Sequence, residues 1–365
     1  MKVLFLVPYP LEGASYRYRI HQFLPYLQKE NISYKVSSFI SQDFYKILYK
    51  KGYLLKKLFF TLLGLQRRFI DILSLYTYDV IFIHLESSPL PILLLERMAQ
   101  VLKKPIIYDF DDAIFLEKEN STNILRTILK AYKKTPQRIA LSSKIIVSNQ
   151  YLKNISSRYI HENKISIIPT CINTDLFKPK NESNTIPVIG WLGSHSTYPY
   201  LEDILDIFPI LSKQYNFILK IIGAPHKMNL PQVHCIQKDW SLKDEINDFQ
   251  SFDIGIYPLA NTEWVKGKAG FKAIQYMAAY IPCIASNVGV NKEIIQDGLN
   301  GFLVNTKEEW IAKISLLLSN PTLRSAMMRE GRKTIERRFS LKTHAPAFVN
   351  GIKEFDLNQN HVTSI

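Results

Sequence analysis

Small polar residues and lysines in the second half of the chain could bind a phosphorylated ligand. The segment 193–196, Gly-Ser-His-Ser, stands between an apolar strand pattern at 187–193 and a helical pattern. Small residues at such a turn let backbone N–H groups approach a phosphate, and the positive end of a helix dipole favours the anion. Lys266, Lys268 and Lys272 follow in a cluster that could neutralise a departing diphosphate. This half therefore has the chemistry to bind a nucleotide diphosphate.

The first half offers charged and titratable side chains after three predicted strands. Gly13 precedes Arg17 and Arg19, following the apolar run 3–7. A glycine loop at the carboxyl end of a strand borders the crevice in which open α/β sheets bind ligands. Two guanidinium groups there could meet a donor or acceptor phosphate through paired hydrogen bonds.

A histidine and three carboxylates end the next two strands. His84 closes the apolar run 80–84, and Asp109, Asp111 and Asp112 close the run 105–109. Carboxylates at a strand end are costly unless they bind something or cap a helix. We predict a role in the site for His84 and Asp111. The alternatives are a satisfied core histidine and aspartates that serve as helix N-caps.

The elements that must position these residues alternate between apolar strands and helices. This alternation is typical of a parallel, doubly wound sheet. A polar stretch at 177–184 without periodicity predicts a linker, after which the pattern restarts. The sequence thus predicts two α/β units, with strands at 3–7, 80–84, 105–109, 143–148, 165–169, 187–193, 217–223, 252–257 and 282–286.

The composition indicates a globular protein with polyanionic partners. The 365 residues are 47% hydrophobic and 21% charged, with a formal net charge of +14. Such a charge favours nucleic acid, anionic lipid or phosphorylated small molecules. No nucleic-acid motif is recognised, so we expect no nucleic acid. The three cysteines are scattered, which predicts neither a disulfide framework nor a zinc site and suits a reducing compartment.

One segment indicates a peripheral membrane contact. Residues 44–69 contain seven Lys or Arg and no acidic residue, interleaved with Leu and Phe. That mixture is typical of an interfacial amphipathic segment on an anionic leaflet. No run approaches the roughly 20 apolar residues of a spanning helix. The N-terminus lacks the features of a signal peptide. We therefore expect a cytoplasmic location at the inner face of the membrane. The alternative is a solvated basic helix with its apolar side in the core.

Two stretches of the second half carry a family resemblance. They read GFKAIQYMAAYIPCIASNVG at 270–289 and DGLNGFLV at 297–304. The chain resembles the retaining glycosyltransferases of family 4 (glycosyl transferases group 1). This resemblance implies a GT-B fold, two Rossmann-like domains facing across a cleft. It implies an acceptor domain over 1–180, a donor domain over 185–340, and a C-terminal helix and tail over 341–365 that packs back on the first domain.

The resemblance also implies site roles and an activity. His84 would lie beside the transferred sugar, and Gln275 would contact the nucleotide ribose. The family pattern has two glutamates where this chain has Gly267 and Gln275. The implied reaction moves a sugar from a nucleotide-diphosphate sugar to a lipid-linked or polysaccharide acceptor, with no metal and no other cofactor. The predicted donor-binding residues are Gly193, Ser194, His195, Lys268, Gly270, Phe271, Lys272 and Gln275.

Two alternatives to a transferase remain open. A GT-B epimerase of sugar nucleotides would need acidic and basic groups around the sugar carbon. A non-catalytic GT-B subunit that binds a nucleotide sugar would suit the absence of the two glutamates.

Overall fold

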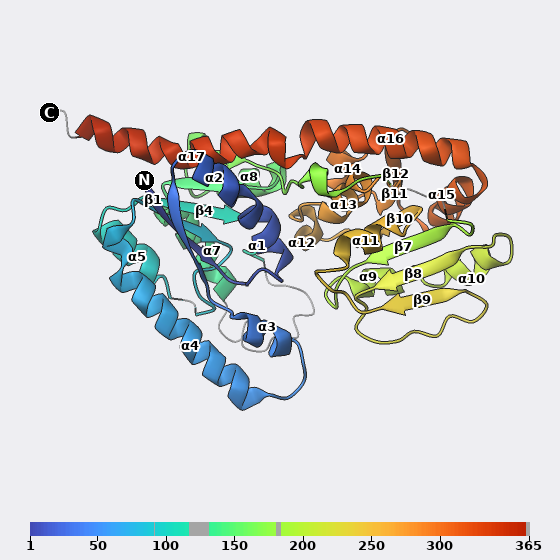
Figure 1. The fold of residues 1–365 in the computed structure, drawn as a ribbon, viewed down its shortest axis with the longest axis horizontal. Helices are drawn as coiled ribbons and strands as arrows, with labels where there is room; N and C mark the ends of the chain where they lie inside the picture. The colour runs from blue at the N-terminus through green and yellow to red at the C-terminus, as the bar shows by residue number, and fades with distance from the viewer. Residues whose placement is uncertain (91, 117–130, 180–183, 363–365) are drawn as a thin grey trace. The chain divides into compact units, whose positions relative to one another are not determined.

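The chain forms two compact units of α/β structure. The computed structural model describes residues 1–90, 92–116, 131–179 and 184–362 (Figure 1). Unit 1 comprises Met1–Thr170 with His344–Ile365, and unit 2 comprises Cys171–Thr343. Within the described ranges, no helix is both long and apolar enough to cross a membrane.

In the described part of unit 1, six parallel strands form one sheet. They are β1 (Lys2–Val7), β2 (Ser33–Ser38), β3 (Val80–His84), β4 (Ile106–Phe110), β5 (Lys144–Val147) and β6 (Ile165–Ile167). Their order in the sheet is β2-β1-β3-β4-β5-β6. Every residue of β3, β4 and β5 is buried, as expected for parallel strands covered on both faces. The direction of winding reverses between β1 and β3, the place where open α/β sheets bind ligands.

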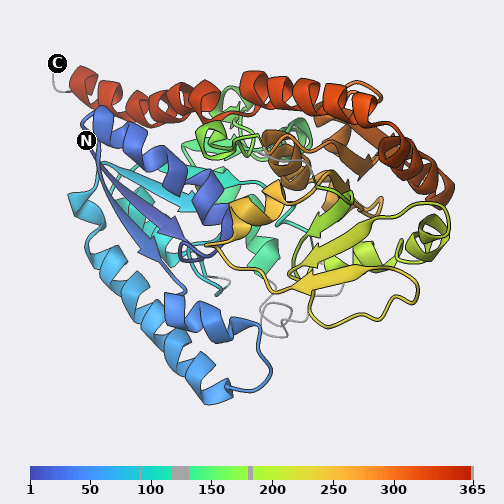
Figure 2. The same cartoon turned by 45° about the vertical axis from the view of Figure 1, so that its right-hand side comes forward.

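Helices cover the sheet of unit 1. They are α1 (Ala14–Arg19), α2 (Leu24–Lys29), α3 (Gln42–Leu48), α4 (Leu54–Leu73), α5 (Leu94–Val101), α7 (Thr135–Leu141), α8 (Gln150–Ser156) and α17 (Leu341–Val362). Helix α4 runs beside α5, and α3 lies at its amino-terminal half (Figure 2). Within unit 1, α17 is fixed by Phe348, which stacks on Phe23 with ring centroids 4.3 Å apart.

In the described part of unit 2, a second sheet again has six parallel strands. They are β7 (Val188–Leu192), β8 (Ile218–Ile222), β9 (Cys235–Lys238), β10 (Ile254–Tyr257), β11 (Cys283–Ser286) and β12 (Gly301–Val304). The order is β12-β11-β10-β7-β8-β9, so the winding reverses between β7 and β10. The flanking helices are α9 (Tyr198–Glu202), α10 (Ile207–Ser212), α11 (Glu245–Gln250), α12 (Glu263–Lys266), α13 (Phe271–Ala278), α14 (Asn291–Ile294), α15 (Lys307–Ser319) and α16 (Pro321–Arg338).

These two sheets confirm the predicted α/β fold class. Each of the nine predicted apolar runs overlaps an observed strand. The structure adds β2, β9 and β12, which the strand prediction omits. Part of the predicted linker, residues 180–183, lies outside the described residues.

Candidate functional site

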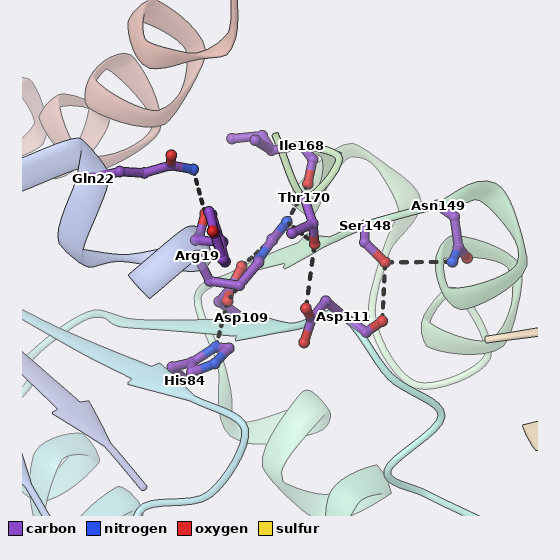
Figure 3. Close-up of polar contacts among 10 residues, drawn as sticks. Arg19, Gln22, His84, Asp109, Asp111, Ser148, Asn149, Ile168 and Thr170 are labelled. Atoms are coloured by element: carbon purple, nitrogen blue, oxygen red, sulfur yellow. Dashed lines mark hydrogen bonds and ion pairs between the residues drawn. The ribbon is translucent and has the colours of Figure 1, made fainter. Parts of the chain in front are cut away.

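The carboxyl ends of β3 and β4 bring a histidine and an aspartate together in unit 1. The parallel register sets His84 opposite Asp109. The His84 Nδ1 atom lies 2.7 Å from the Asp109 Oδ2 atom, and both side chains are fully buried (Figure 3). A carboxylate only accepts hydrogen bonds, so Nδ1 carries a proton, and in the neutral ring Nε2 therefore presents a lone pair. That Nε2 atom is buried and has no hydrogen-bond partner among the described residues.

Arg19, the last residue of α1, completes this buried pair. Its guanidinium contacts both carboxylate oxygens of Asp109, and its Nη1 donates to the Ile168 carbonyl at 2.6 Å. Burial alone would raise the pKa of the Asp109 carboxyl, but the Arg19 charge and the His84 hydrogen bond hold that pKa below its ordinary value. Asp109 is therefore an ionised, fixed partner for His84. Arg19, which the sequence predicts as a phosphate ligand, is committed to Asp109 in this structure.

Asp111 lies at the same edge of the sheet, just beyond β4. Its Oδ2 atom accepts a hydrogen bond from the Thr170 hydroxyl at 3.2 Å, while its buried Oδ1 has no partner among the described residues. Burial, and then the negative charge of Asp112, raise the pKa of Asp111. No helix begins within 111–116, so the N-cap alternative for Asp111 and Asp112 is wrong. Figure 3 shows Asp111 beside Asp109. The Thr170 hydroxyl links the two through Arg19, since it donates to Asp111 and accepts a hydrogen bond from Arg19 Nη1 at 3.5 Å.

The glycine loop of unit 1 shapes the start of α1. Gly13 is the N-cap residue of that helix, and a Cβ atom there would lie 2.5 Å from Tyr9 Cβ. The close approach of Tyr9 therefore requires glycine. Arg17 is half-buried, and its Nη1 donates to the carbonyls of Leu11 and Glu12 at 3.3 and 3.0 Å. Arg17 thus braces the loop that precedes its own helix.

In unit 2, the predicted anion-binding turn follows β7. The Gly193 N–H donates to the Ile222 carbonyl at 3.0 Å, which joins the turn to the end of β8. Ser194 N donates to the Thr197 hydroxyl at 3.1 Å, and Ser194 Oγ lies 3.0 Å from Ser196 Oγ. Ser194 and His195 are exposed. This turn sits at the reversal point of the sheet, between β7 and β10.

The amino terminus of α13 gathers most of the other predicted donor ligands. Gly270 is its N-cap residue in the left-handed conformation, with φ +63°. Phe271 begins the helix, and Lys272 Nζ donates to Gln275 Oε1 at 2.8 Å. Gln275 is 1% exposed, and its Nε2 donates a second hydrogen bond to Glu245 Oε1 at 2.9 Å. Just before this helix, the half-buried Lys268 donates its main-chain N–H to the Val265 carbonyl.

Glu245 is a candidate site residue that sequence reasoning misses. It is 4% exposed and lies on α11, thirty positions before Gln275. Nothing in its neighbourhood, Lys-Asp-Glu-Ile-Asn-Asp, sets it apart from other charged surface residues. Only the packing of α11 near α13 brings a carboxylate to Gln275.

In the part of the chain that the structure describes, the acidic residues do not gather as a metal site. Over the described ranges, no three His, Cys, Asp or Glu side chains are placed to hold a metal ion. The expectation that no metal takes part stays a prediction.

Comparison with known proteins bears on both units. Residues 173–334 match the model of the family Glycosyl transferases group 1. A curated relative, the capsular polysaccharide biosynthesis glycosyltransferase CapM of Staphylococcus aureus, is 26% identical over 226 residues. That alignment covers 54% of this chain and 57% of CapM.

Solved structures resemble nearly the whole chain. A glycosyltransferase from Rickettsia africae has a TM-score of 0.69 at 17% identity, covering 97% of this chain and 98% of its own. Anabaena HepE, solved with UDP-glucose, has a TM-score of 0.69 at 14% identity, covering 97% and 100%. At such identities the likeness establishes the fold. The chain therefore has a GT-B fold, and its residues 173–334 match the family Glycosyl transferases group 1.

Proposed function

We propose that this protein is a glycosyltransferase that moves a sugar from a nucleotide-diphosphate sugar to a lipid-linked or polysaccharide acceptor in cell-surface glycan synthesis. The observation that carries the proposal is the group 1 domain over residues 173–334 in a chain with a GT-B fold. The capsule-synthesis relative supports the substrate class, and the structural neighbour that holds UDP-glucose supports the kind of donor.

We assign the donor to unit 2. In the turn after β7 the N–H groups of Gly193 and Ser194 are bonded within the protein, so there the exposed side chains of Ser194 and His195 would meet the diphosphate. The start of α13 would add the positive end of its helix dipole and the Lys272 cation, which stabilise the charge of a leaving diphosphate. Lys272 and Gln275, linked at 2.8 Å, would contact the nucleotide moiety. Transfer with retention of configuration, without a metal, is part of the proposal. The assigned donor ligands are Gly193, Ser194, His195, Lys268, Gly270, Phe271, Lys272 and Gln275.

We assign the sugar-side chemistry to the buried edge of unit 1. The lone pair of His84 Nε2 can accept a hydrogen bond from a sugar or acceptor hydroxyl, and Asp111 Oδ1 can take a second polar contact. Both atoms are buried without partners among the described residues, a cost that a bound polar ligand would remove. Arg19 and Asp109 hold His84 in place. The departing phosphate can itself accept the acceptor proton. Gly13 and Arg17 shape the neighbouring loop.

A peripheral contact with the inner face of the membrane is also part of the proposal. Helix α4 leaves large apolar side chains exposed, as in an interfacial helix. One correction applies to the predicted basic segment: Arg68 is 4% exposed and turned into unit 1, so it cannot face a lipid.

A non-catalytic nucleotide-sugar-binding subunit is the second candidate. It is favoured by the resemblance, which implies glutamates at the positions where this chain has Gly267 and Gln275.

The deciding experiment measures nucleotide release from UDP-, GDP-, ADP- and CMP-sugars, with and without a lipid-linked acceptor fraction. Release that depends on acceptor supports the transferase. Sugar interconversion without release would favour an epimerase. Binding in a thermal-shift screen without turnover would favour the non-catalytic subunit.

A further inference from the structure

Helix α4 carries an apolar stripe on its outer side. Its exposed apolar residues include Leu55, which is 81% exposed, and Phe59, which is 58% exposed. The spacing of these residues places them along one side of the helix, and the row reaches past the basic segment to Leu73. The full set on α4 is Leu54, Leu55, Leu58, Phe59, Leu62, Leu63, Phe69, Ile70 and Leu73.

The polarity of α4 is the reverse of that of an ordinary surface helix. The residues it buries are Gly64, Arg68 and Asp71, while most of its leucines and phenylalanines are exposed. Leu65 and Phe60, which stacks on Phe44, are half-buried. Lys50, Lys51 and Lys56 are exposed around the start of the helix, and no acidic residue occurs from 44 to 70. An apolar stripe with a basic margin is complementary to an anionic bilayer surface.

The inner side of α4 is fixed by a buried ion pair. Arg68 Nη1 lies 3.0 Å from Asp71 Oδ2, and the two side chains are 5% and 0% exposed. Lys35 Nζ adds a contact to Asp71 Oδ1 at 3.1 Å. Burial lowers the pKa of Arg68 to about 10, which leaves the group charged at neutral pH. Breaking a buried ion pair costs several kcal/mol of stability, so Arg68 keeps its position on the inner side of α4. A displacement of α4 would therefore displace the groups that Arg68 contacts.

Arg68 holds segments at the carboxyl ends of three strands. Its Nη2 donates to the Val7 carbonyl at 3.0 Å, at the end of β1. Its Nη1 donates to Ser37 Oγ at 2.8 Å, in β2. Its Nε donates to the Ser87 carbonyl, three residues beyond His84. One guanidinium thus joins α4 to the edge of the sheet that carries the candidate site.

The segment after His84 is also held from its other side. Ser87 Oγ donates to Glu96 Oε1 at 2.8 Å, and Arg138 Nε donates to the same oxygen at 2.7 Å. Leu85, between His84 and Ser87 in the sequence, has a left-handed backbone with φ +58°. A leucine keeps this conformation only where the surrounding structure imposes it. A change in the position of Ser87 would therefore alter the backbone conformation of Leu85, which follows His84.

We propose that α4 binds an anionic bilayer through its apolar stripe and that Arg68 is a positioning residue that transmits this contact to the segment after His84. The inference rests on the membrane contact proposed above and adds a physical link from the lipid surface to the site. Binding of α4 to the membrane and ordering of residues 85–88 would then be coupled through Arg68.

The test measures hydrogen–deuterium exchange of the full chain with vesicles of phosphatidylglycerol and phosphatidylcholine, and with phosphatidylcholine alone. We expect co-sedimentation with the anionic vesicles and a severalfold slowing of exchange in α4 and at residues 85–88. The variant Arg68→Met/Asp71→Asn removes the link without leaving a buried charge unpaired. It is expected to bind vesicles as the wild type does, with slowing in α4 and none at 85–88.

Two controls keep the result interpretable. Arg68→Lys retains the charge beside Asp71 but cannot reach Val7, Ser37 and Ser87 together, so it serves if the double variant unfolds. Leu55→Ser/Phe59→Ser weakens the stripe and leaves the Arg68 link intact, so it should abolish co-sedimentation.

Each failure points to one part of the proposal. Absence of vesicle binding, or a stable dimer that buries α4 in sedimentation without lipid, overturns the bilayer as the occupant. Equal slowing at 85–88 in wild type and the Arg68 variants, or none in lipid-bound wild type, overturns the transmission. None of these outcomes depends on sugar transfer, which the donor panel tests separately.

Discussion

The Nδ1 atom of His84 lies 2.7 Å from the Oδ2 atom of Asp109, and the other carboxylate oxygen of Asp109 is bound by Arg19. Arg19 only donates and the carboxylate only accepts, so this arrangement fixes the tautomer of His84. In the neutral ring, the lone pair of Nε2 is thereby presented at the carboxyl edge of the sheet.

Asp109→Asn should reverse that tautomer. The amide oxygen would turn to Arg19, so the amide N–H would face His84 Nδ1 and force the proton to Nε2. We expect activity to fall on the order of 10²-fold if Nε2 accepts a proton or hydrogen bond, and unfolding to become easier by about 3 kcal/mol as the buried pair is lost. Nitrogen NMR of the His84 ring and urea unfolding measure the two effects.

Asp79→Asn is the matched control for that substitution. Asp79 accepts a hydrogen bond from Lys2 N at 2.6 Å, at the amino-terminal edge of the same sheet. It should leave the His84 tautomer and the activity unchanged. An Nε2 lone pair retained in Asp109→Asn would show that Asp109 does not set the tautomer.

Asp111 makes stability depend on pH. Its folded-state pKa is raised by burial and by Asp112, so the folded state binds the proton more tightly than the unfolded state does. That contribution is fully present below the unfolded value of about 3.9 and is lost as pH rises through the folded value. Asp111→Asn has no proton to lose. Its unfolding free energy relative to wild type should therefore rise as pH rises, which denaturation across this range would detect.

A pH-independent difference between the two proteins would contradict this account of Asp111. The low pKa of Asp109 has the opposite effect, since its stabilisation is lost as pH falls. It is present in both proteins and cancels in the comparison.

The sequence predicted the interior strands of both sheets and the edge strand β6, but it missed the edge strands β2, β9 and β12. All five residues of β3 are buried, and such continuous apolar runs are visible in the sequence. Strand β2, Ser-Tyr-Lys-Val-Ser-Ser, lies at an edge and buries only one residue completely. Strand β9 is also an edge strand and buries none completely. With one neighbour each, these strands need few apolar residues and give little signal.

The candidate site was predictable only where it follows strand ends. His84 and Asp111 could be found because parallel strands present their carboxyl ends at one edge. Arg17 and Arg19 look equivalent in the sequence, yet two positions along a helix point nearly opposite ways, so Arg19 is buried and Arg17 half-buried. The Arg19–Asp109 contact joins residues 90 positions apart, a tertiary fact that no local pattern carries.

Substitutions at Gly270 and Gly298 distinguish two costs of adding a side chain, namely backbone strain and steric overlap. Both are left-handed, with φ +63° and +78°, but a Cβ at Gly270 would lie 2.5 Å from Ile294 Cδ1 while one at Gly298 would meet nothing within 4 Å. Gly298→Ala should cost about 1 kcal/mol, and Gly270→Ala about 2 to 4 kcal/mol because overpacking adds to the strain. Thermal unfolding ranks the two variants. Nucleotide affinity should fall only for Gly270→Ala, and equal losses would remove α13 from the donor site.

The Glu245–Gln275 contact can be tested by exchanging its members. Gln275→Glu would place two carboxylates about as close as the present 2.9 Å contact, in a buried site. One must then take up a proton, and we expect a loss of about 2 kcal/mol at neutral pH. The raised pKa makes this loss shrink as pH falls, which urea unfolding at several pH values measures.

The exchanged pair, Glu245→Gln with Gln275→Glu, supplies the control. It restores one carboxylate facing one amide and lets Lys272, now 2.8 Å from Gln275 Oε1, face a charged oxygen. Its unfolding free energy should return to within about 1 kcal/mol of wild type, since contacting residues compensate each other. If the exchanged pair were no more stable than Gln275→Glu alone, the two side chains would not be in contact. Glu245 would then have no part in the donor site.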